Sequence, residues 1–360
     1  MISIRYYRIY DIGKEIDLDQ LEQNLALTFC TTRTSFLRIK PKSIVLENKP
    51  VIIRTDHIEV ENDEKKFLFS VLARIYDIGA ISLCFSYDIP DGNYAEMEEM
   101  ALYFSENNII SDDMFQNTLN VMGERLKPVL KDFSYDPDFY EDYTIYVTDS
   151  VHIEGDPVIL IMGEKAEFSL QVRDEIMKNA QSYTKDDLAI ISWDSALLCS
   201  PEIPMPVDLI DLIEYANVQV LELRYYDREL TRQMGRMYDD IELADRLPSF
   251  LRMRQYHLIM KQLMERNAEI SEVIEKVHNL IKITEDVYYA RVYATTLKVI
   301  RSSQWTESVS RKIETIQNNY SMLSDEVRIQ HSNFLEWVVI ILIALELMLG
   351  VWEYMLLQTL

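Results

Sequence analysis

Residues 334–357 read FLEWVVIILIALELMLGVWEYMLL, and the segment that leads into them sets the architecture of the C-terminal part of the chain. Upstream, apolar side chains recur in alternating steps of four and three residues, at Val309, Ile313, Ile316, Tyr320, Leu323 and Val327. A 3.5-residue repeat keeps one face of a helix against a partner, so these residues predict a coiled-coil seam for self-association. No proline or glycine falls between positions 309 and 349, which predicts one continuous helix. The alternative is that this face packs inside the chain's own helical bundle.

The apolar segment is long enough to cross a bilayer, which takes about 20 mostly apolar residues. Fourteen Leu, Ile, Val and Phe residues lie between positions 334 and 357. Together they contribute about −4 to −8 kcal/mol to insertion, while a carboxylate near the centre costs about 3 kcal/mol. Glu346 and Glu353 interrupt the run, but the sum still favours insertion. We therefore predict one transmembrane helix over residues 334–357; the alternative is an apolar association helix of a soluble oligomer.

Glu346 and Glu353 share one face of this helix with Gly350, and it is not the face that continues the seam. A carboxylate that faces lipid is costly, so this face is expected to meet protein, water or a proton. Gly350 lets a second backbone approach closely. These three residues are therefore candidates for an intramembrane polar contact.

The composition indicates a folded and strongly acidic chain. Of the 360 residues 48% are hydrophobic, too many for a disordered chain, and the formal net charge is −24. This charge repels the phosphates of nucleic acids and of anionic lipids, so direct nucleic-acid binding is not expected and a basic protein partner fits better. Cys30, Cys84 and Cys199 lack metal-ligand or redox spacing, which indicates reduced thiols of a cytoplasmic protein. The start, MISIRYYRIYDIG, resembles neither a signal peptide nor a transit peptide, so we expect the C-terminal segment to direct membrane attachment.

Strand and helix patterns alternate before residue 200. Alternating or β-branched runs predict strands at 2–11, 43–46, 51–54, 57–60, 67–76, 80–87, 143–148 and 158–162, with another apolar run at 188–193. Asp17 is expected to cap a short helix, and helical spacing follows at 93–106, 111–131 and 169–179. Pro201, Pro204 and Pro206 then precede an amphipathic helix at 206–245 and further helices at 249–282 and 285–302. We predict an α+β fold with an α+β domain over 1–200, a helical bundle over 201–303, the stalk over 304–333 and the transmembrane helix.

One hexamer, RIYDIG, occurs twice, at residues 8–13 and 74–79. Each copy closes a predicted strand. Glycine permits a turn, aspartate hydrogen-bonds it, and Ile and Tyr fill a sheet. The repeat therefore predicts two related strand–turn units, a structural role rather than a ligand site.

Motifs for enzymatic chemistry are missing from the sequence, which has no glycine-rich phosphate loop, GxSxG or HExxH. The tripeptide His-Ile-Glu occurs at 57–59 and 152–154, and two neighbouring strands that carry it would form a two-His, two-carboxylate metal site. A solvated sheet face explains these residues better, and Asp194-Ser195 fits a turn better than a nucleophile. We predict no enzymatic activity, no catalytic residue, no cofactor and no metal ligand.

Three stretches carry a resemblance to a known family: GAISLCFSYDIP at 79–90, DLAIISWDSALL at 187–198, and 318–350, where Leu335-Glu336-Trp337 enters the run ILIALE. With the stalk and the domain order, they resemble the Required for Meiotic Nuclear Division family, also described as a domain of unknown function. The resemblance implies a membrane-anchored protein without a recognised enzymatic activity. Mitochondrial relatives are linked to the inner membrane and to mitochondrial translation. Without transit-peptide character, this chain resembles a prokaryotic member.

Together these features predict a tail-anchored, self-associating scaffold whose α+β domain holds a partner near the membrane. The expected partners are a second copy of the chain, the membrane and a basic protein. Arg328 lies upstream of the span and no Lys or Arg follows Glu353, so we expect a single-pass protein of the inner (cytoplasmic) membrane with its bulk in the cytoplasm. Two alternatives stay open: an anchored enzyme or ligand- or metal-binding domain in residues 1–200, and an ion or proton path along the Glu346 and Glu353 face.

Overall fold

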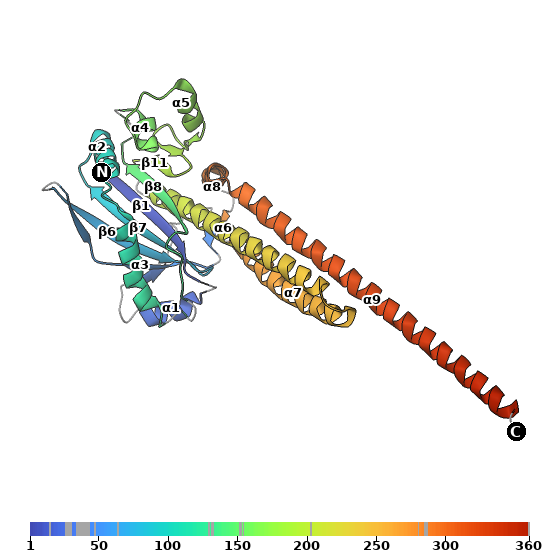
Figure 1. Cartoon of the computed structure of the whole chain (residues 1–360). Helices are drawn as coiled ribbons and strands as arrows, with labels where there is room; N and C mark the ends of the chain where they lie inside the picture. The colour runs from blue at the N-terminus through green and yellow to red at the C-terminus, as the bar shows by residue number, and fades with distance from the viewer. Residues whose placement is uncertain are drawn as a thin grey trace. The chain divides into compact units, whose positions relative to one another are not determined.

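The N-terminal strand β1 (Ile2–Asp11) lies in the middle of a large sheet, antiparallel to β7 (Ala80–Ile89) on one side and to β8 (Tyr140–Thr148) on the other. The computed structural model in Figure 1 describes residues 1–13, 16–25, 31–33, 44–46, 48–62, 65–128, 130, 133–150, 153, 155–201, 204–279, 281–283 and 287–358. Over these residues the sheet has ten strands in the order β2-β4-β6-β7-β1-β8-β11-β10-β9, with β5 paired to β6. The further strands are β2 (Thr31–Arg33), β4 (Val51–Arg54), β5 (Ile58–Asn62), β6 (Lys65–Ile75), β9 (Ala180–Gln181), β10 (Leu188–Ile191) and β11 (Ser195–Cys199). A separate pair joins β3 (Ile44–Leu46) to β12 (Ile281–Ile283).

Helices cover both faces of the sheet, so β1 buries side chains on both of its faces. Ile4 and Tyr10 belong to a core shared with α1 (Leu18–Leu25), α2 (Tyr94–Glu106), α3 (Asp112–Leu126), α4 (Pro157–Met162) and α5 (Leu170–Met177). Tyr7 and Ile9 belong to a second core on the opposite face, with the first half of α6 (Pro204–Asp245) and with α8 (Val287–Val299). Because successive side chains of a strand alternate between faces, this arrangement requires apolar residues at nearly every position.

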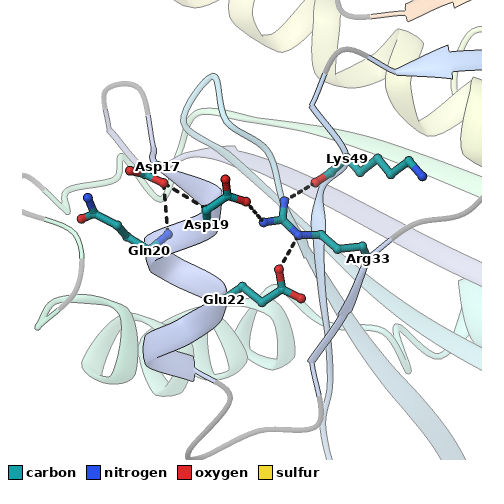
Figure 2. Close-up of polar contacts among 6 residues, drawn as sticks. All are labelled: Asp17, Asp19, Gln20, Glu22, Arg33 and Lys49. Carbon is teal, nitrogen blue, oxygen red and sulfur yellow. Dashed lines mark hydrogen bonds and ion pairs between the residues drawn. The ribbon is translucent and has the colours of Figure 1, made fainter.

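The first helix confirms the predicted cap. The Asp17 carboxylate accepts hydrogen bonds at 3.0 Å from the backbone N–H groups of Asp19 and Gln20, and thereby pairs two donors that the start of α1 leaves open. Figure 2 shows how Arg33 of β2 then joins this helix, through Asp19 and Glu22, to the carbonyl of Lys49, each at 2.7 Å. The cap and the arginine together fix α1 at the end of the sheet that holds β2.

Most predicted strands and helices are confirmed. The helix expected over 249–282 ends at Asn279, because 281–283 form the strand β12. The strand expected at 158–162 is wrong, since this segment forms the helix α4. Residues at both ends of this segment favour a helix, and they outweigh the strand preference of its apolar side chains. The side chain of Asp156 accepts from Val158 N at 3.1 Å, Pro157 occupies the first turn, and Gly163 ends the helix with φ 67°. The apolar run predicted over 188–193 is shorter than expected, because β10 ends at Ile191 and a turn leads into β11.

The chain divides into two compact units. Unit 1 comprises Met1–Tyr225 and Val273–Thr306, and it contains the sheet, its covering helices and the first half of α6. Unit 2 comprises Tyr226–Glu272 and Glu307–Leu360, with the second half of α6, most of α7 (Ser249–Asn279) and most of α9 (Ser302–Gln358). The predicted continuous C-terminal helix is confirmed, because α9 runs unbroken through the stalk and the apolar segment. The boundary predicted near the prolines at 201–206 follows a change in composition. The compact units divide the chain elsewhere, because the first half of α6 belongs to the unit that holds the sheet.

Candidate functional site

The exposure of α9 changes along its length. Val309, Ile316 and Leu323 are each at most 2% exposed, Val327 is 9% exposed, and Gln330 is half-buried. Every residue from 335 to 350 is exposed. By length and composition, α9 is a candidate membrane span, and its most apolar stretch is 0% buried. The helix therefore has a packed first part and an unpacked apolar second part.

Helix α6 contributes to the packing of the first part, within unit 2. The Lys312 ammonium lies 2.6 Å from both Asp227 Oδ1 and Thr231 Oγ1, and Ser308 Oγ donates to Asp227 Oδ1 at 2.6 Å. The predicted seam follows the same side of α9, with Ile313 and Tyr320 half-buried and the other four residues buried. Packing inside the chain's own bundle, the alternative to a coiled-coil dimer, accounts for this burial. Self-association through Val309, Ile313, Ile316, Tyr320, Leu323 and Val327 stays a prediction.

The predicted polar face lies in the unpacked part. Glu346 and Gly350 are exposed, and a Cβ built on Gly350 has nothing within 4 Å. Glu353 lies in the same helix. The fold thus leaves room for a neighbour beside Glu346 and Gly350.

The arginines of the two hexamers point to opposite faces of the sheet. Arg8 pairs in register with Leu83 of β7, whereas Arg74 pairs with Ser82, one residue away. Because neighbouring residues of a strand point to opposite faces, this shift sends the two arginines in opposite directions. Gly13 and Gly79 both take a positive φ, at 141° and 97°, so the predicted turn role of the glycine is confirmed in both copies.

Arg8 is itself buried, at 7% exposed, in an aromatic-lined position that is half-open because its carboxylate partners reach solvent. Its Nε and Nη2 donate to the two Asp142 oxygens at 2.6 and 3.1 Å, and Nη1 donates to Asp112 Oδ1 at 2.8 Å. The guanidinium lies 4.0 Å from the ring centroid of Tyr140 and 4.5 Å from that of Phe115. The carboxylate partners are mostly solvated, since the side chains of Asp112 and Asp142 are 70% and 50% exposed.

Arg74 faces α6 and lies in a fully buried charge network. Its Nη1 lies 2.6 Å from Asp211 Oδ1 and also pairs with Glu214 Oε2, while the Tyr76 hydroxyl donates to Glu214 Oε1 at 3.0 Å. Burial raises the pKa of both carboxyls, and the charge of Arg74 opposes that rise. Burial lowers the pKa of Arg74, but Glu214 and Asp211 outweigh it and hold that pKa well above its ordinary value. The network joins α6 to β6.

A third buried carboxyl, Glu222, lies farther along α6 and is 1% exposed. Among the described residues its Oε1 has no hydrogen-bond partner. Burial, and then the charges of Asp11 and Asp77 from the two hexamers, raise the pKa of Glu222 well above its ordinary value. The neutral, protonated form of this carboxyl is therefore favoured over the charged form more strongly than in water.

The amphipathic pattern of α6 does not predict these buried acids. An amphipathic helix was predicted at 206–245, yet every residue from 208 to 223 is buried. The available signal was the three-residue spacing of Asp208, Asp211 and Glu214, which places three acids on one side of a helix within an apolar stretch. Nothing in that spacing identifies Arg74 as their partner.

Only one of the two His-Ile-Glu tripeptides lies fully within the described residues. His57 and Glu59 are exposed at the start of β5, where His57 Nδ1 lies 3.1 Å from Ser70 Oγ, while His152 and Glu154 lie outside the described residues. Within the described part of the chain, no group of three or more His, Cys, Asp or Glu is placed to hold a metal ion. Ser195 Oγ donates to the Ile161 carbonyl at 2.8 Å, which ties the β10–β11 turn to α4.

Comparison with known proteins identifies relatives of the α+β part. A family model described as "Uncharacterized protein MJ0711, N-terminal domain" matches residues 1–205. Uncharacterized protein MJ0711 of Methanocaldococcus jannaschii is 24% identical over 288 residues, which cover 74% of this chain and 85% of the relative. No solved structure matches the chain. Neither match carries the name Required for Meiotic Nuclear Division, so that resemblance stays a prediction.

Proposed function

The chain belongs to the family described as the N-terminal domain of uncharacterized protein MJ0711, and we propose that it is a membrane-anchored tether. In this proposal the second part of α9 crosses a bilayer and holds the family domain beside it. The observation that carries the proposal is the uninterrupted exposure of residues 335–350. Soluble monomers rarely expose a contiguous apolar surface larger than a few hundred Å².

The composition of the exposed stretch supports lipid rather than water as its solvent. Leu342, Leu347 and Leu349 are each more than half exposed, as are most of their neighbours. Trp337, 64% exposed, stands near the start of the run, and Trp is enriched where a span meets the headgroups. In a helix all backbone N–H and C=O groups pair internally, as a bilayer requires.

The polar face of the span supports self-association inside the membrane. A carboxylate such as Glu346 costs about 3 kcal/mol when it faces lipid. The free space beside Gly350 allows a second helix to approach and cover that carboxylate. We place a second copy of the chain on the face with Glu346, Gly350 and Glu353, with the buried seam packed inside each copy.

The family domain has a binding role in this proposal and no catalytic one. Its buried charged groups serve the fold, because Arg74, Asp211 and Glu214 join α6 to the sheet. The chain's net charge of −24 supports a basic partner. The body of the protein lies on the cytoplasmic side of a cytoplasmic membrane in this proposal, with Arg328 close to the lipid surface.

Carbonate extraction of membranes tests the anchor. Replacing Leu342 and Leu345 by Arg adds about 5–7 kcal/mol to the cost of insertion and cancels the gain from the apolar residues. We expect this variant, like a deletion of residues 334–360, to leave the membrane fraction, because the stretch has no packing partner in the described chain. The matched Leu342→Ala, Leu345→Ala variant should stay. An Arg variant that resists extraction would refute the proposal.

A further inference from the structure

The end of the α6–α7 hairpin carries exposed leucines. Helix α6 ends at Asp245 and α7 begins at Ser249. Across this turn, Leu243, Leu247 and Leu251 recur every four residues and are 61%, 37% and 47% exposed. Exposed leucines are unremarkable singly, but three together at the end of a hairpin form an apolar tip.

The hairpin tip lies beside the part of α9 that precedes the span. Tyr256 of α7 donates to Asp245 of α6, which closes the hairpin. Burial and then Asp245 raise the pKa of Tyr256 to about 12, and the charge of Glu326 on α9 adds to the rise. Figure 1 shows the end of the hairpin alongside α9, which continues past it. All of these residues belong to unit 2.

The tip therefore lies near the level at which α9 enters the proposed bilayer. The seam ends at Val327 and the exposed run begins at Leu335. Eight residues of helix span about 12 Å, and a headgroup layer is about 5–8 Å thick on each side of the hydrocarbon. Flexible side chains at the tip can bridge the difference. Ile329, 53% exposed on α9, extends the apolar surface toward the span.

The turn of the hairpin carries three arginines and one acid. Residues 243–254 contain Arg246, Arg252 and Arg254 with Asp245, while Asp239, Asp240 and Glu242 precede them on α6. Arg246 and Arg254 are exposed. Arg246 pairs with Glu242 at 2.6 Å, but an exposed pair within one helix is weak and can be exchanged for a lipid phosphate.

We propose that the hairpin tip, comprising residues 243–254, is a second membrane contact that binds the anionic lipid surface of the bilayer that α9 crosses. The leucines enter the interface and the arginines bind headgroup phosphates, as in other interfacial segments with leucine beside arginine. The field of distant charges of the chain is screened over about 8 Å at physiological salt, and within residues 243–254 the three arginines outnumber Asp245. The inference rests on the proposed anchor, and it adds a fixed orientation of unit 2 on the membrane.

Site-specific fluorescence in the full chain tests this contact. A bimane label is attached to Leu247→Cys or Leu251→Cys in a Cys30→Ser background; Cys84 and Cys199 are buried, with thiol pKa values raised by burial to about 11 and about 12, so they react slowly at pH 7. The proteins are reconstituted into phosphatidylcholine vesicles with or without phosphatidylserine. With phosphatidylserine, iodide quenching at 247 and 251 should fall about threefold or more, and a headgroup-level nitroxide lipid should quench both labels.

Labels at two further positions distinguish a failure of the tip contact from a failure of the proposed anchor. A label at Met322→Cys, 56% exposed and upstream on α9, should stay open to iodide. A label at Ile343→Cys should be quenched by a nitroxide deep in the acyl chains. If Ile343→Cys is quenched and the tip labels stay open to iodide, the tip contact is wrong and the anchor stands. If Ile343→Cys is not quenched, the proposed function itself is wrong.

Removing the positive charges of the tip tests whether its arginines bind headgroup phosphates. Arg246→Gln with Arg254→Gln should restore iodide access at 247, whereas Arg311→Gln, an exposed arginine far upstream on α9, should not. Equal protection in vesicles without phosphatidylserine, or protection that survives the loss of Arg246 and Arg254, would overturn binding to anionic lipid.

Discussion

Replacing Arg74 by methionine tests whether the two copies of one hexamer have different structural roles. The substitution leaves Asp211 and Glu214 without their cation, and these side chains are only 5% and 1% exposed. Breaking a buried ion pair in this way costs about 3–5 kcal/mol, because an uncompensated charge remains inside. Arg8→Met is the matched control. Arg8 is as buried as Arg74, but its partners Asp112 and Asp142 are largely solvated and stay hydrated when the arginine is lost, so the loss of these ion pairs and ring contacts should cost about 1–2 kcal/mol.

The pH dependence of the Arg74→Met variant follows from the same burial. In the native chain burial already raises the pKa of Asp211 and Glu214 against the effect of Arg74. Without the arginine, the folded-state pKa of each rises further above its unfolded value. The folded state then binds more protons than the unfolded state, so stability falls as pH rises above about 4. The deficit of the variant should therefore be largest near pH 8 and shrink toward pH 5.

Thermal unfolding of the full chain in detergent, followed by circular dichroism, measures both effects. A domain of this size shifts by about 2–4 °C per kcal/mol, so Arg74→Met should lower Tm by about 6–20 °C at pH 7 and Arg8→Met by about 2–8 °C. Equal losses in the two variants would refute the assignment of the hexamers to a buried and a half-open environment. A deficit of Arg74→Met that grows on acidification would refute the role of the two carboxyls.

Two further predictions concern α9 and α6. Leu323→Asp places a charge at a position only 2% exposed and should destabilise unit 2 by about 3–5 kcal/mol without changing the subunit number in light scattering, whereas Met322→Asp, at an exposed position, should do neither. A changed subunit number with unchanged helicity would restore the coiled-coil interpretation. Glu222→Gln should flatten the pH dependence of urea unfolding, because the raised pKa of Glu222 costs stability as pH rises above about 4. The variant should gain stability at pH 8 and little at pH 5; no difference between these pH values would contradict a raised pKa of Glu222.

Local patterns predicted most of the sheet and all of the long helices, because they depend on neighbouring residues. The alternation in residues 2–11 predicted the strand β1, and the absence of Pro and Gly over 309–349 predicted the unbroken helix α9. The segment 158–162 shows where composition misleads. Asp156, Pro157 and Gly163 were present as start and stop signals, and they decided the helix against a β-branched run.

Features that depend on register or on distant partners could not be predicted. Identical hexamers gave no indication that Arg8 and Arg74 would face opposite sides, since one residue of offset against β7 decides it. The acids Asp211 and Glu214 were visible in α6, but their partner lies about 140 positions earlier in the chain. Burial of a charge is a property of the tertiary contact, and local spacing does not contain it.

The heptad pattern of α9 shows why periodicity identifies a face but not what covers it. The four-and-three spacing continues from Val327 to Trp337 and Ile341 without a change of phase. Up to Val327 the structure covers this face with protein, whereas Trp337 and Ile341 are 64% and 54% exposed. The residue types change at this point: charged side chains surround the seam upstream, while apolar residues occupy nearly the whole circumference downstream. An apolar stripe along one side is enough for a helix that packs against protein on that side only. A helix that is apolar on all sides and has no protein around it needs an apolar solvent. The change from stripe to full circumference, rather than the repeat itself, is what supports a membrane as the partner of the second part of α9.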